Sequence, residues 1–118
     1  MKKLISQVIG GWHHGKGSKN SRKGNYDLAL KHFQAALKYA MQSNNEASLP
    51  LEMECIARTY VRLGNYEQAQ KYAQDSLSKY KKFQKTGNIF EACVGRVTEL
   101  LRIIEKRGQL GIVDAHSA

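Results

Sequence analysis

One phrase occurs twice in this chain of 118 residues, and it constrains the fold more than any other feature. The first copy reads GNYDLALKHFQAAL from Gly24, and the second reads GNYEQAQKYAQDSL from Gly64, 40 residues later. Both copies place an Ala three residues, a Lys five residues and a Leu eleven residues after the Tyr. Repetition at a fixed period indicates an architecture in which similar supersecondary units stack along the chain.

Apolar residues recur at helical spacing around these phrases. The spacing i, i+3, i+4, i+7 predicts an amphipathic helix that begins at Tyr26 and ends near Ser43. A single Pro and a hydrophobic fraction of 42% also favour helices over a sandwich or a barrel. We therefore expect an all-α antiparallel helical hairpin array, with the first apolar stripe formed by Tyr26, Ala29, Leu30, Phe33, Leu37, Ala40 and Met41.

Three further helices are predicted after this one. Ser48 is placed to cap a second helix that contains Pro50 in its first turn, and Gly64 ends that helix with a positive φ. The third helix is expected over residues 66–85. The fourth is expected over residues 89–107, apolar on more than one face and ended by Gly108 and Gly111.

The chain divides into three predicted parts. Residues 1–23 form a basic, Gly-rich N-terminal arm or a degenerate first helix, residues 24–108 the helical domain, and residues 109–118 a short tail. Within the arm, residues 1–9 favour a short amphipathic helix, whereas the glycines of residues 10–25 predict a loop or a frayed helix. Trp12 is expected to anchor this stretch on the first good helix.

The net charge of +9 is unevenly distributed. Six basic residues, and no acidic one, precede Asp27. A basic tract of this kind suits an acidic protein surface, nucleic acid or an anionic membrane face, but it is equally consistent with a solvated arm. The residues are Lys2, Lys3, Lys16, Lys19, Arg22 and Lys23.

The repeated phrase and its flanking helices resemble the tetratricopeptide repeat (TPR) family. The resemblance covers residues 24–108, or about two and a half repeats, and the usual repeat is about 34 residues long. The longer period here is similar to the long-repeat branch of that family. The likeness rests on Gly24, Tyr26, Ala29, Phe33, Ala36 and Leu37, and on Ile56, Ala57, Tyr60, Gly64, Tyr66, Ala69 and Leu77.

The resemblance implies a concave groove that holds a peptide or a helix of a partner protein. Arginines recur on the helix faces that would line this groove, which suits an acidic or carboxylate-bearing segment. A solvated basic helix face would give the same pattern. The candidate partner-binding residues are Arg22, Glu54, Arg58, Val61, Arg62, Thr98, Arg102 and Lys106.

Two motifs in the N-terminal arm have residues suited to chemistry. Gly10, Gly15 and Lys16 match the phosphate-binding loop motif GxxxxGK(S/T), but Gly17 stands where the motif requires Ser or Thr. The adjacent His13 and His14 could ligate a metal together with His32 or His116, yet no Cys/His cluster supports a closed site. We therefore predict no catalytic residue, no cofactor and no metal site.

The sequence thus predicts a protein-binding or scaffold module without enzymatic activity. A nucleic-acid-associated protein using the basic arm is the alternative, and a nucleotide-binding protein with a degenerate phosphate loop is a remote one. A homodimer through the helix at residues 89–107 remains open. No apolar run approaches the ~18 residues of a membrane span, and a cytoplasmic location is the default. Cys55 and Cys93 lie within apolar helical patterns and are expected to be small buried hydrophobes, with a disulfide left open.

Overall fold

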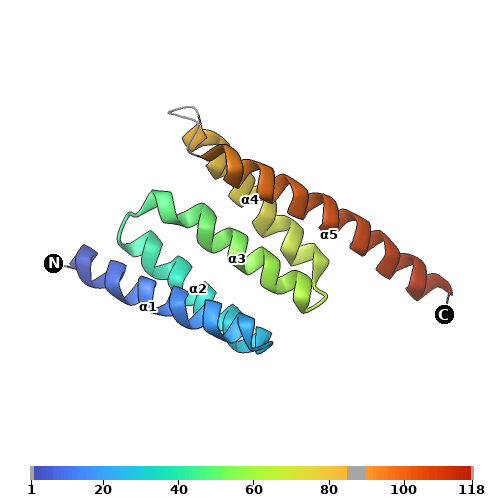
Figure 1. Cartoon of the computed structure of the whole chain (residues 1–118), viewed down its shortest axis with the longest axis horizontal. Coiled ribbons are helices and arrows are strands. Elements are labelled where there is room, and N and C mark those ends of the chain that lie inside the picture. The colour runs from blue at the N-terminus through green and yellow to red at the C-terminus, as the bar shows by residue number, and fades with distance from the viewer. Residues whose placement is uncertain (1, 85–89, 118) are drawn as a thin grey trace.

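The computed structural model describes residues 2–84 and 90–117, with side chains as far as residue 109. The helices lie side by side in sequence order, as Figure 1 shows, and the molecule measures 56 × 33 × 20 Å. The predicted all-α helical hairpin array is confirmed. The described residues form α1 (Lys2–Arg22), α2 (Tyr26–Gln42), the short 3₁₀ helix η1 (Glu46–Ser48), α3 (Leu49–Arg62), α4 (Tyr66–Gln84) and α5 (Glu91–Ser117).

The turns of the repeated phrase have the predicted backbone conformation. Gly24 has φ of +82° and Gly64 has φ of +78°, values in the left-handed region that glycine adopts without steric cost. Each glycine therefore lets one helix end and the next begin within a few residues. Ser48 precedes α3 as predicted, but its hydroxyl donates to the carbonyl oxygen of Asn45 instead of capping the helix.

The prediction of a loop or a frayed helix over residues 10–25 was wrong, because α1 runs unbroken from Lys2 to Arg22. Two of its glycines serve close packing. A Cβ on Gly17 would lie 2.7 Å from Cε1 of Phe33, and a Cβ on Gly10 would lie 3.3 Å from Cβ of Tyr39. Glycine lets α1 approach α2 closely, and this packing outweighs the low helix propensity of the segment.

Helix α3 lies at the centre of the array, packed against both α2 and α4 and touching α5. Ile56 joins Ala29 and Phe33 of α2 in one core cluster, while Ala57 joins Ala69 and Ala73 of α4 in another. The small residues permit close contact between helices. Since α3 has neighbours on several sides, it buries seven of its residues: Pro50, Glu52, Glu54, Ile56, Ala57, Thr59 and Val61.

Helix α5 differs from the prediction at its C-terminal end. It continues to Ser117, so Gly108 and Gly111 do not end it and the backbone of residues 109–117 is helical. Its stripe packs on α4 through Val97, Leu100 and Ile104. The start predicted at residue 89 lies outside the described residues. On α2, Met41 was assigned to the buried stripe, but it is 60% exposed.

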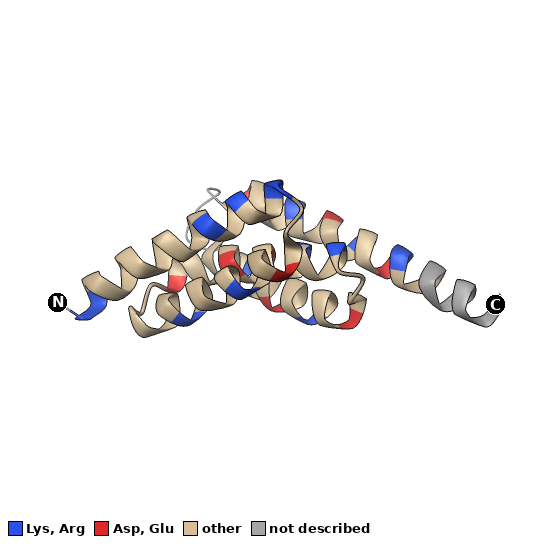
Figure 2. Ribbon diagram, turned by 90° about the horizontal axis from the view of Figure 1, so that it is seen from below, with Lys and Arg blue, Asp and Glu red and all other residues tan. Residues whose placement is uncertain are grey.

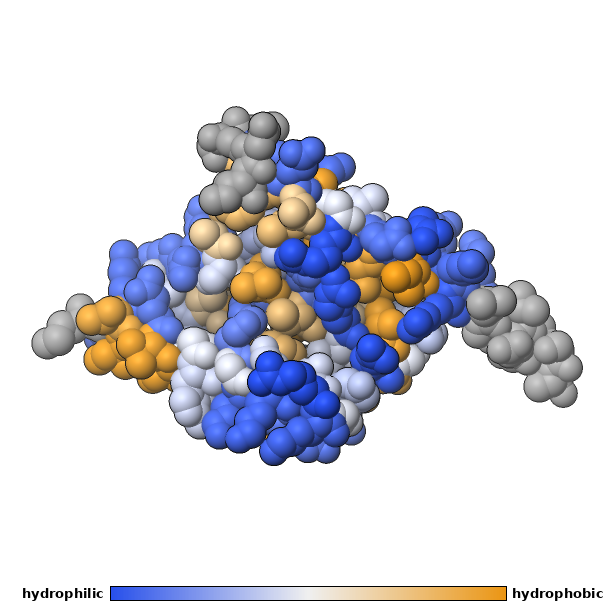
Figure 3. Space-filling view, viewed as in Figure 1, coloured by the Kyte–Doolittle hydropathy of each residue, from blue (hydrophilic) through white to orange (hydrophobic). Residues whose placement is uncertain are grey.

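The first half of α1 presents apolar side chains to solvent. Leu4, Ile5 and Val8 are all more than half exposed, and Figure 3 shows an apolar patch near the N-terminal end. Trp12 is also exposed, although its ring makes an edge contact with His32 of α2. Trp12 therefore touches the helix it was expected to anchor on without being buried there. Within the described residues, no helix is both long and apolar enough to cross a membrane.

Candidate functional site

A cavity with a basic rim lies where α1, α3 and α5 meet. It encloses about 250 Å³, which is room for one or two side chains of a bound peptide and less than the ~300 Å³ of the smallest usual ligand pockets. We call it the basic cavity. It is lined by Ser21 of α1, by Arg58, Val61 and Arg62 of α3, and by Leu100, Ile103 and Arg107 of α5.

The chemistry of the basic cavity is amphipathic. Val61 and Leu100 are buried and provide an apolar floor, whereas Arg58, Arg62 and Arg107 are exposed and provide guanidinium groups. Arg62 lies over the ring of Tyr26, 5.9 Å from its centroid, in a cation–π contact. Among the described residues, no carboxylate pairs with Arg62 or Arg107. These two groups are therefore available to an anion from outside the chain.

Positive charge also gathers on α1 beside the basic cavity. Helix α1 contains no acidic residue, and Lys19 and Arg22 lie in its last turn. Figure 2 shows the resulting excess of Lys and Arg along this helix. Since Ser21 lines the cavity, the last turn of α1 adjoins it, and the charged side chains of Lys19 and Arg22 would add to the attraction of an anion.

The predicted binding residues other than Glu54 divide into three groups. Arg58, Val61 and Arg62 lie together at the basic cavity, but Val61 was placed on the exposed groove face and is instead buried, where it forms the floor. Arg22 is exposed next to Ser21. On α5, the exposed residues Thr98, Arg102 and Lys106 do not line the cavity, and Arg102 pairs instead with Glu99 at 2.5 Å.

Glu54 was placed on the groove face, and this prediction was wrong. Its side chain is 4% exposed and lies among donors from three helices. Arg96 donates from Nε at 2.6 Å and from Nη2 at 2.8 Å, Arg58 donates from Nε at 3.1 Å, and the hydroxyl of Tyr80 donates at 3.1 Å. Glu54 therefore orients Arg58 at the rim of the cavity and ties α3 to α4 and α5.

The pKa values in this cluster follow from its geometry. Burial alone would raise the pKa of Glu54, but the hydrogen bonds and charges of Arg96 and Arg58 outweigh it and lower the pKa below its ordinary value. The pKa of Tyr80 is raised by burial and by the adjacent Glu54 carboxylate. The carboxylate thus stays charged while the phenol stays protonated, as a donor to Glu54 must.

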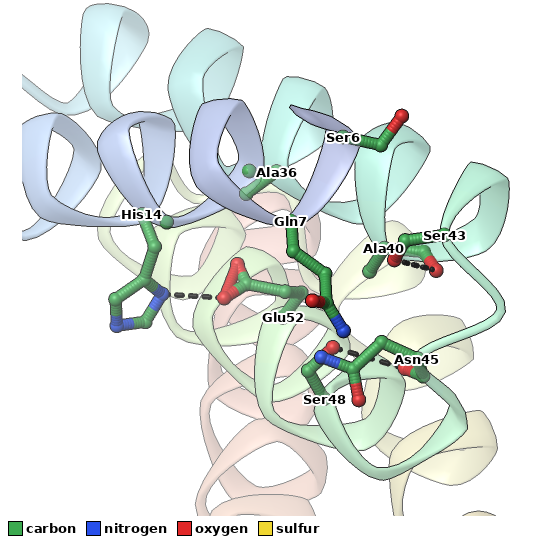
Figure 4. A pocket seen from close by; sticks show the side chains of 11 residues that line it. Ser6, Gln7, His14, Ala36, Ala40, Ser43, Asn45, Ser48 and Glu52 are labelled. Atoms are coloured by element: carbon green, nitrogen blue, oxygen red, sulfur yellow. Dashed lines mark hydrogen bonds and ion pairs between the residues drawn. The ribbon is translucent and has the colours of Figure 1, made fainter. Parts of the chain in front are cut away.

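A second, smaller cavity lies between α1, α2 and the η1–α3 corner. It encloses about 180 Å³, and Figure 4 shows the side chain of Gln7 directed toward Asn45 and Ser48. His14 Nδ1 lies 2.5 Å from Oε1 of Glu52, while Glu52 Oε2 has no hydrogen-bond partner within the described part of the chain. Burial raises the pKa of Glu52, and His14 offsets this in part. This contact joins the N-terminal helix to α3.

The almost complete phosphate-loop motif cannot form a phosphate cradle here. Gly10, Gly15 and Lys16 lie inside α1, where backbone N–H groups bond to carbonyl groups of the preceding turn. The loop geometry that aims several N–H groups at one phosphate is absent from this segment.

The structure separates the two adjacent histidines that the sequence offered as joint metal ligands, and it leaves both cysteines unbridged. His13 contacts His32, whereas His14 faces Glu52, and the side chain of His116 lies outside the described set. In the described residues, no group of three or more His, Cys, Asp or Glu side chains could hold a metal ion. Cys55 and Cys93 are free thiols and only partly buried, so the disulfide left open by the sequence is not formed.

Sequence reasoning missed Arg107 and Ser21 in the basic cavity. Arg107 stood at the predicted end of the fourth helix, and Ser21 stood in a predicted loop, so neither was assigned to the groove. Ser21 could have been assigned to the site only if α1 had been predicted as one continuous helix.

Comparison of the chain with protein-family models, with curated proteins and with solved structures finds no match.

Proposed function

We propose that the chain is a protein-binding module, similar in design to tetratricopeptide repeats, that captures an acidic segment of a partner protein in the basic cavity. The observation that most supports this proposal is that two arginines of the basic cavity have no acidic partner within the described residues. These two, Arg62 and Arg107, flank an apolar floor. An Asp or Glu side chain, or a C-terminal carboxylate, would supply the missing charge, and apolar neighbours of that group would cover Val61 and Leu100.

The proposed mechanism does not require catalysis. A guanidinium group presents donors in a fixed fork that matches a carboxylate, which gives orientation as well as attraction. Glu54 holds Arg58 in place before binding, so less side-chain entropy is lost when a partner docks. The basic end of α1 would speed the encounter with an acidic segment.

The test compares two double variants of equal net charge. A fluorescent peptide rich in Asp and Glu, and its Asn/Gln counterpart, are titrated with the chain while anisotropy is measured. Arg62→Glu/Arg107→Glu reverses charge in the basic cavity, whereas Lys71→Glu/Lys82→Glu reverses it on exposed positions of α4. Arg58 is left unchanged because it contacts Glu54.

We expect the wild-type chain to bind the acidic peptide and not the Asn/Gln peptide. The cavity variant should bind at least about tenfold more weakly, since each charge-assisted hydrogen bond contributes about 1.5–3 kcal/mol. The α4 variant should bind nearly as well as wild type. Equal loss in both variants, or no binding of the acidic peptide, would refute the cavity as the site.

Nucleic-acid binding remains the alternative, and the basic helix α1 is the observation that favours it. In the same assay, single-stranded DNA binding would depend steeply on salt concentration. DNA binding would weaken on substitution of Lys16 and Lys19. These lysines lie on the same helix as the exposed Trp12, which could stack on a base, and far from Arg107 in the sequence. Binding of DNA in preference to the acidic peptide would replace the proposal. Homodimerisation through α5 also stays a prediction, which sedimentation velocity would check.

A further inference from the structure

Two histidines from different helices meet on the surface of the α1–α2 pair. Nδ1 of His13 lies 3.0 Å from Nδ1 of His32, 19 residues later in the chain. The ring of Tyr39 stacks on His13 with a centroid distance of 5.7 Å and an interplanar angle of 10°. Trp12 meets both imidazoles edge-on, at centroid distances of 4.9 and 5.8 Å. The two nitrogens are therefore held by rings packed around them.

At this distance one ring N–H donates a hydrogen bond to the other ring nitrogen, and a metal ion bound by both nitrogens would hold them at a similar separation. With metal–nitrogen bonds of about 2.05 Å, neighbouring ligands of a tetragonal ion lie about 2.9 Å apart and those of a tetrahedral ion about 3.3 Å apart. The observed 3.0 Å lies between these two values, so both nitrogens can bind one ion with little movement of the rings. Imidazole suits Cu²⁺ and Ni²⁺, and Cu²⁺ binds most tightly among the first-row divalent ions. Tetragonal geometry with nitrogen and oxygen ligands is typical of Cu²⁺ and Ni²⁺.

We propose that His13 and His32 together bind a divalent tetragonal transition-metal ion, Cu²⁺ or Ni²⁺, through their two Nδ1 atoms. The ion takes the place of the proton shared by the two rings, and water fills its other positions, because the described residues offer no third protein ligand. Both histidines are half-buried, so the ion can reach them from solvent. The site is separate from the basic cavity and does not depend on its function.

The electrostatics of the pair suit a metal ligand. Burial, and then the charge of His32, lower the pKa of His13, which favours the neutral imidazole that metal binding requires. His14 is the natural control, because it is adjacent in the sequence and contacts Glu52 instead of another imidazole. Lys16 lies over Trp12, 5.5 Å from the ring centroid, and adds a positive charge to this cluster.

The single tryptophan of the chain makes the test direct, because Trp12 contacts both imidazoles and bound Cu²⁺ quenches a neighbouring indole. Untagged, metal-free chain is titrated with CuCl₂ while Trp12 emission is followed, in wild type and in His13→Ala, His32→Ala and His14→Gln. NiCl₂ and ZnCl₂ are titrated in parallel with thermal unfolding as the readout, since a ligand of the folded state raises the melting temperature. Circular dichroism of each variant without metal shows whether it folds.

We expect saturable quenching with one equivalent of Cu²⁺, weakened at least about tenfold by either His13→Ala or His32→Ala and retained in His14→Gln. Wild-type binding should also fall sharply from about pH 7.5 to about pH 5, because the imidazoles must lose their protons to bind. Should an alanine variant fail to fold, His13→Asn or His32→Asn, which keeps a side chain able to form a hydrogen bond, takes its place in the titration. Quenching that persists at the lower pH, that survives in both alanine variants, or that disappears equally in His14→Gln would overturn the proposal.

Discussion

Arg96 of α5 donates two hydrogen bonds to the carboxylate of Glu54 on α3, at 2.6 and 2.8 Å, across 42 residues of sequence. The carboxylate is almost fully buried, whereas the Arg96 side chain is 43% exposed. A bidentate guanidinium contact of this kind fixes orientation as well as charge. It fastens the last helix of the array to the central one, next to the basic cavity.

Replacing Arg96 by Ala should destabilise the fold. Glu54 would keep Arg58 and Tyr80 but lose its strongest donor, and a charge-assisted hydrogen bond to a buried group contributes about 2 kcal/mol. Denaturant unfolding would measure the loss. Arg102→Ala on the same helix is the matched control, because its pair with Glu99 is exposed to solvent and should contribute little. Equal effects of the two substitutions would contradict the assigned role of Arg96.

Glu52 and Glu54 should respond to pH in opposite ways. The pKa of Glu54 is lowered in the folded state, so its stabilising effect is present above its unfolded pKa and is lost as pH falls through the folded value. The pKa of Glu52 is raised by burial, so its contribution is full at low pH and is lost as pH rises through the folded value.

Glu54→Gln should therefore lower the melting temperature at neutral pH, whereas Glu52→Gln should raise it. Both differences from wild type should shrink toward about pH 4, where the unfolded carboxyl groups become protonated. Melting curves of the three proteins across this range provide the measurement. Shifts of the same sign at neutral pH would show that one of the two pKa directions is incorrect.

Gly17→Ala should destabilise the chain even though alanine favours helix. Its Cβ would lie 2.7 Å from the ring of Phe33, which is itself buried, and overpacking of this kind costs about 1–3 kcal/mol. Gly11→Ala is the matched control on the same helix, because nothing lies within 4 Å of its new Cβ. That substitution should stabilise the helix by about 0.5–1 kcal/mol. If both variants changed the free energy of unfolding in the same direction relative to wild type, that result would argue against the close α1–α2 contact.

Cys55 should be an unreactive thiol in the folded chain. Burial, followed by the charges of Glu52 and Glu54, raises its pKa to about 12, so very little thiolate is present near pH 8. Alkylation by iodoacetamide, followed by mass spectrometry in a Cys93→Ser background, should be at least about a hundredfold slower than in denaturant. Similar rates with and without denaturant would show that Cys55 is accessible.

Much of the helical framework could be predicted from periodicity. The stripe from Tyr26, the punctuation at Asn44 and the glycine at position 64 located three helices and two turns within a few residues, because local chemistry decides these features. The N-terminal helix could not be predicted in this way. Gly17 is unfavourable for a helix locally, and only its contact with Phe33, 16 residues further along the chain, explains its place there.

The candidate site was predictable only in part, for a similar reason. Arg58 and Arg62 follow from the helical register, and the basic cavity contains both. Glu54 has the same register but points into a three-helix junction, since α3 has neighbours on several sides instead of one. Arg107 also lines the basic cavity, but it stood at the predicted end of the fourth helix and was not assigned to the groove face.

The most direct test of the account maps the bound peptide on the folded wild-type chain. The ¹⁵N-labelled chain is titrated with the acidic peptide, and amide shift changes are followed by NMR. We predict that the changes concentrate around Ser21, Arg62 and Arg107, the three points at which α1, α3 and α5 meet the basic cavity. Changes confined to the first half of α1 or to α4, with none at these three residues, would contradict the central claim.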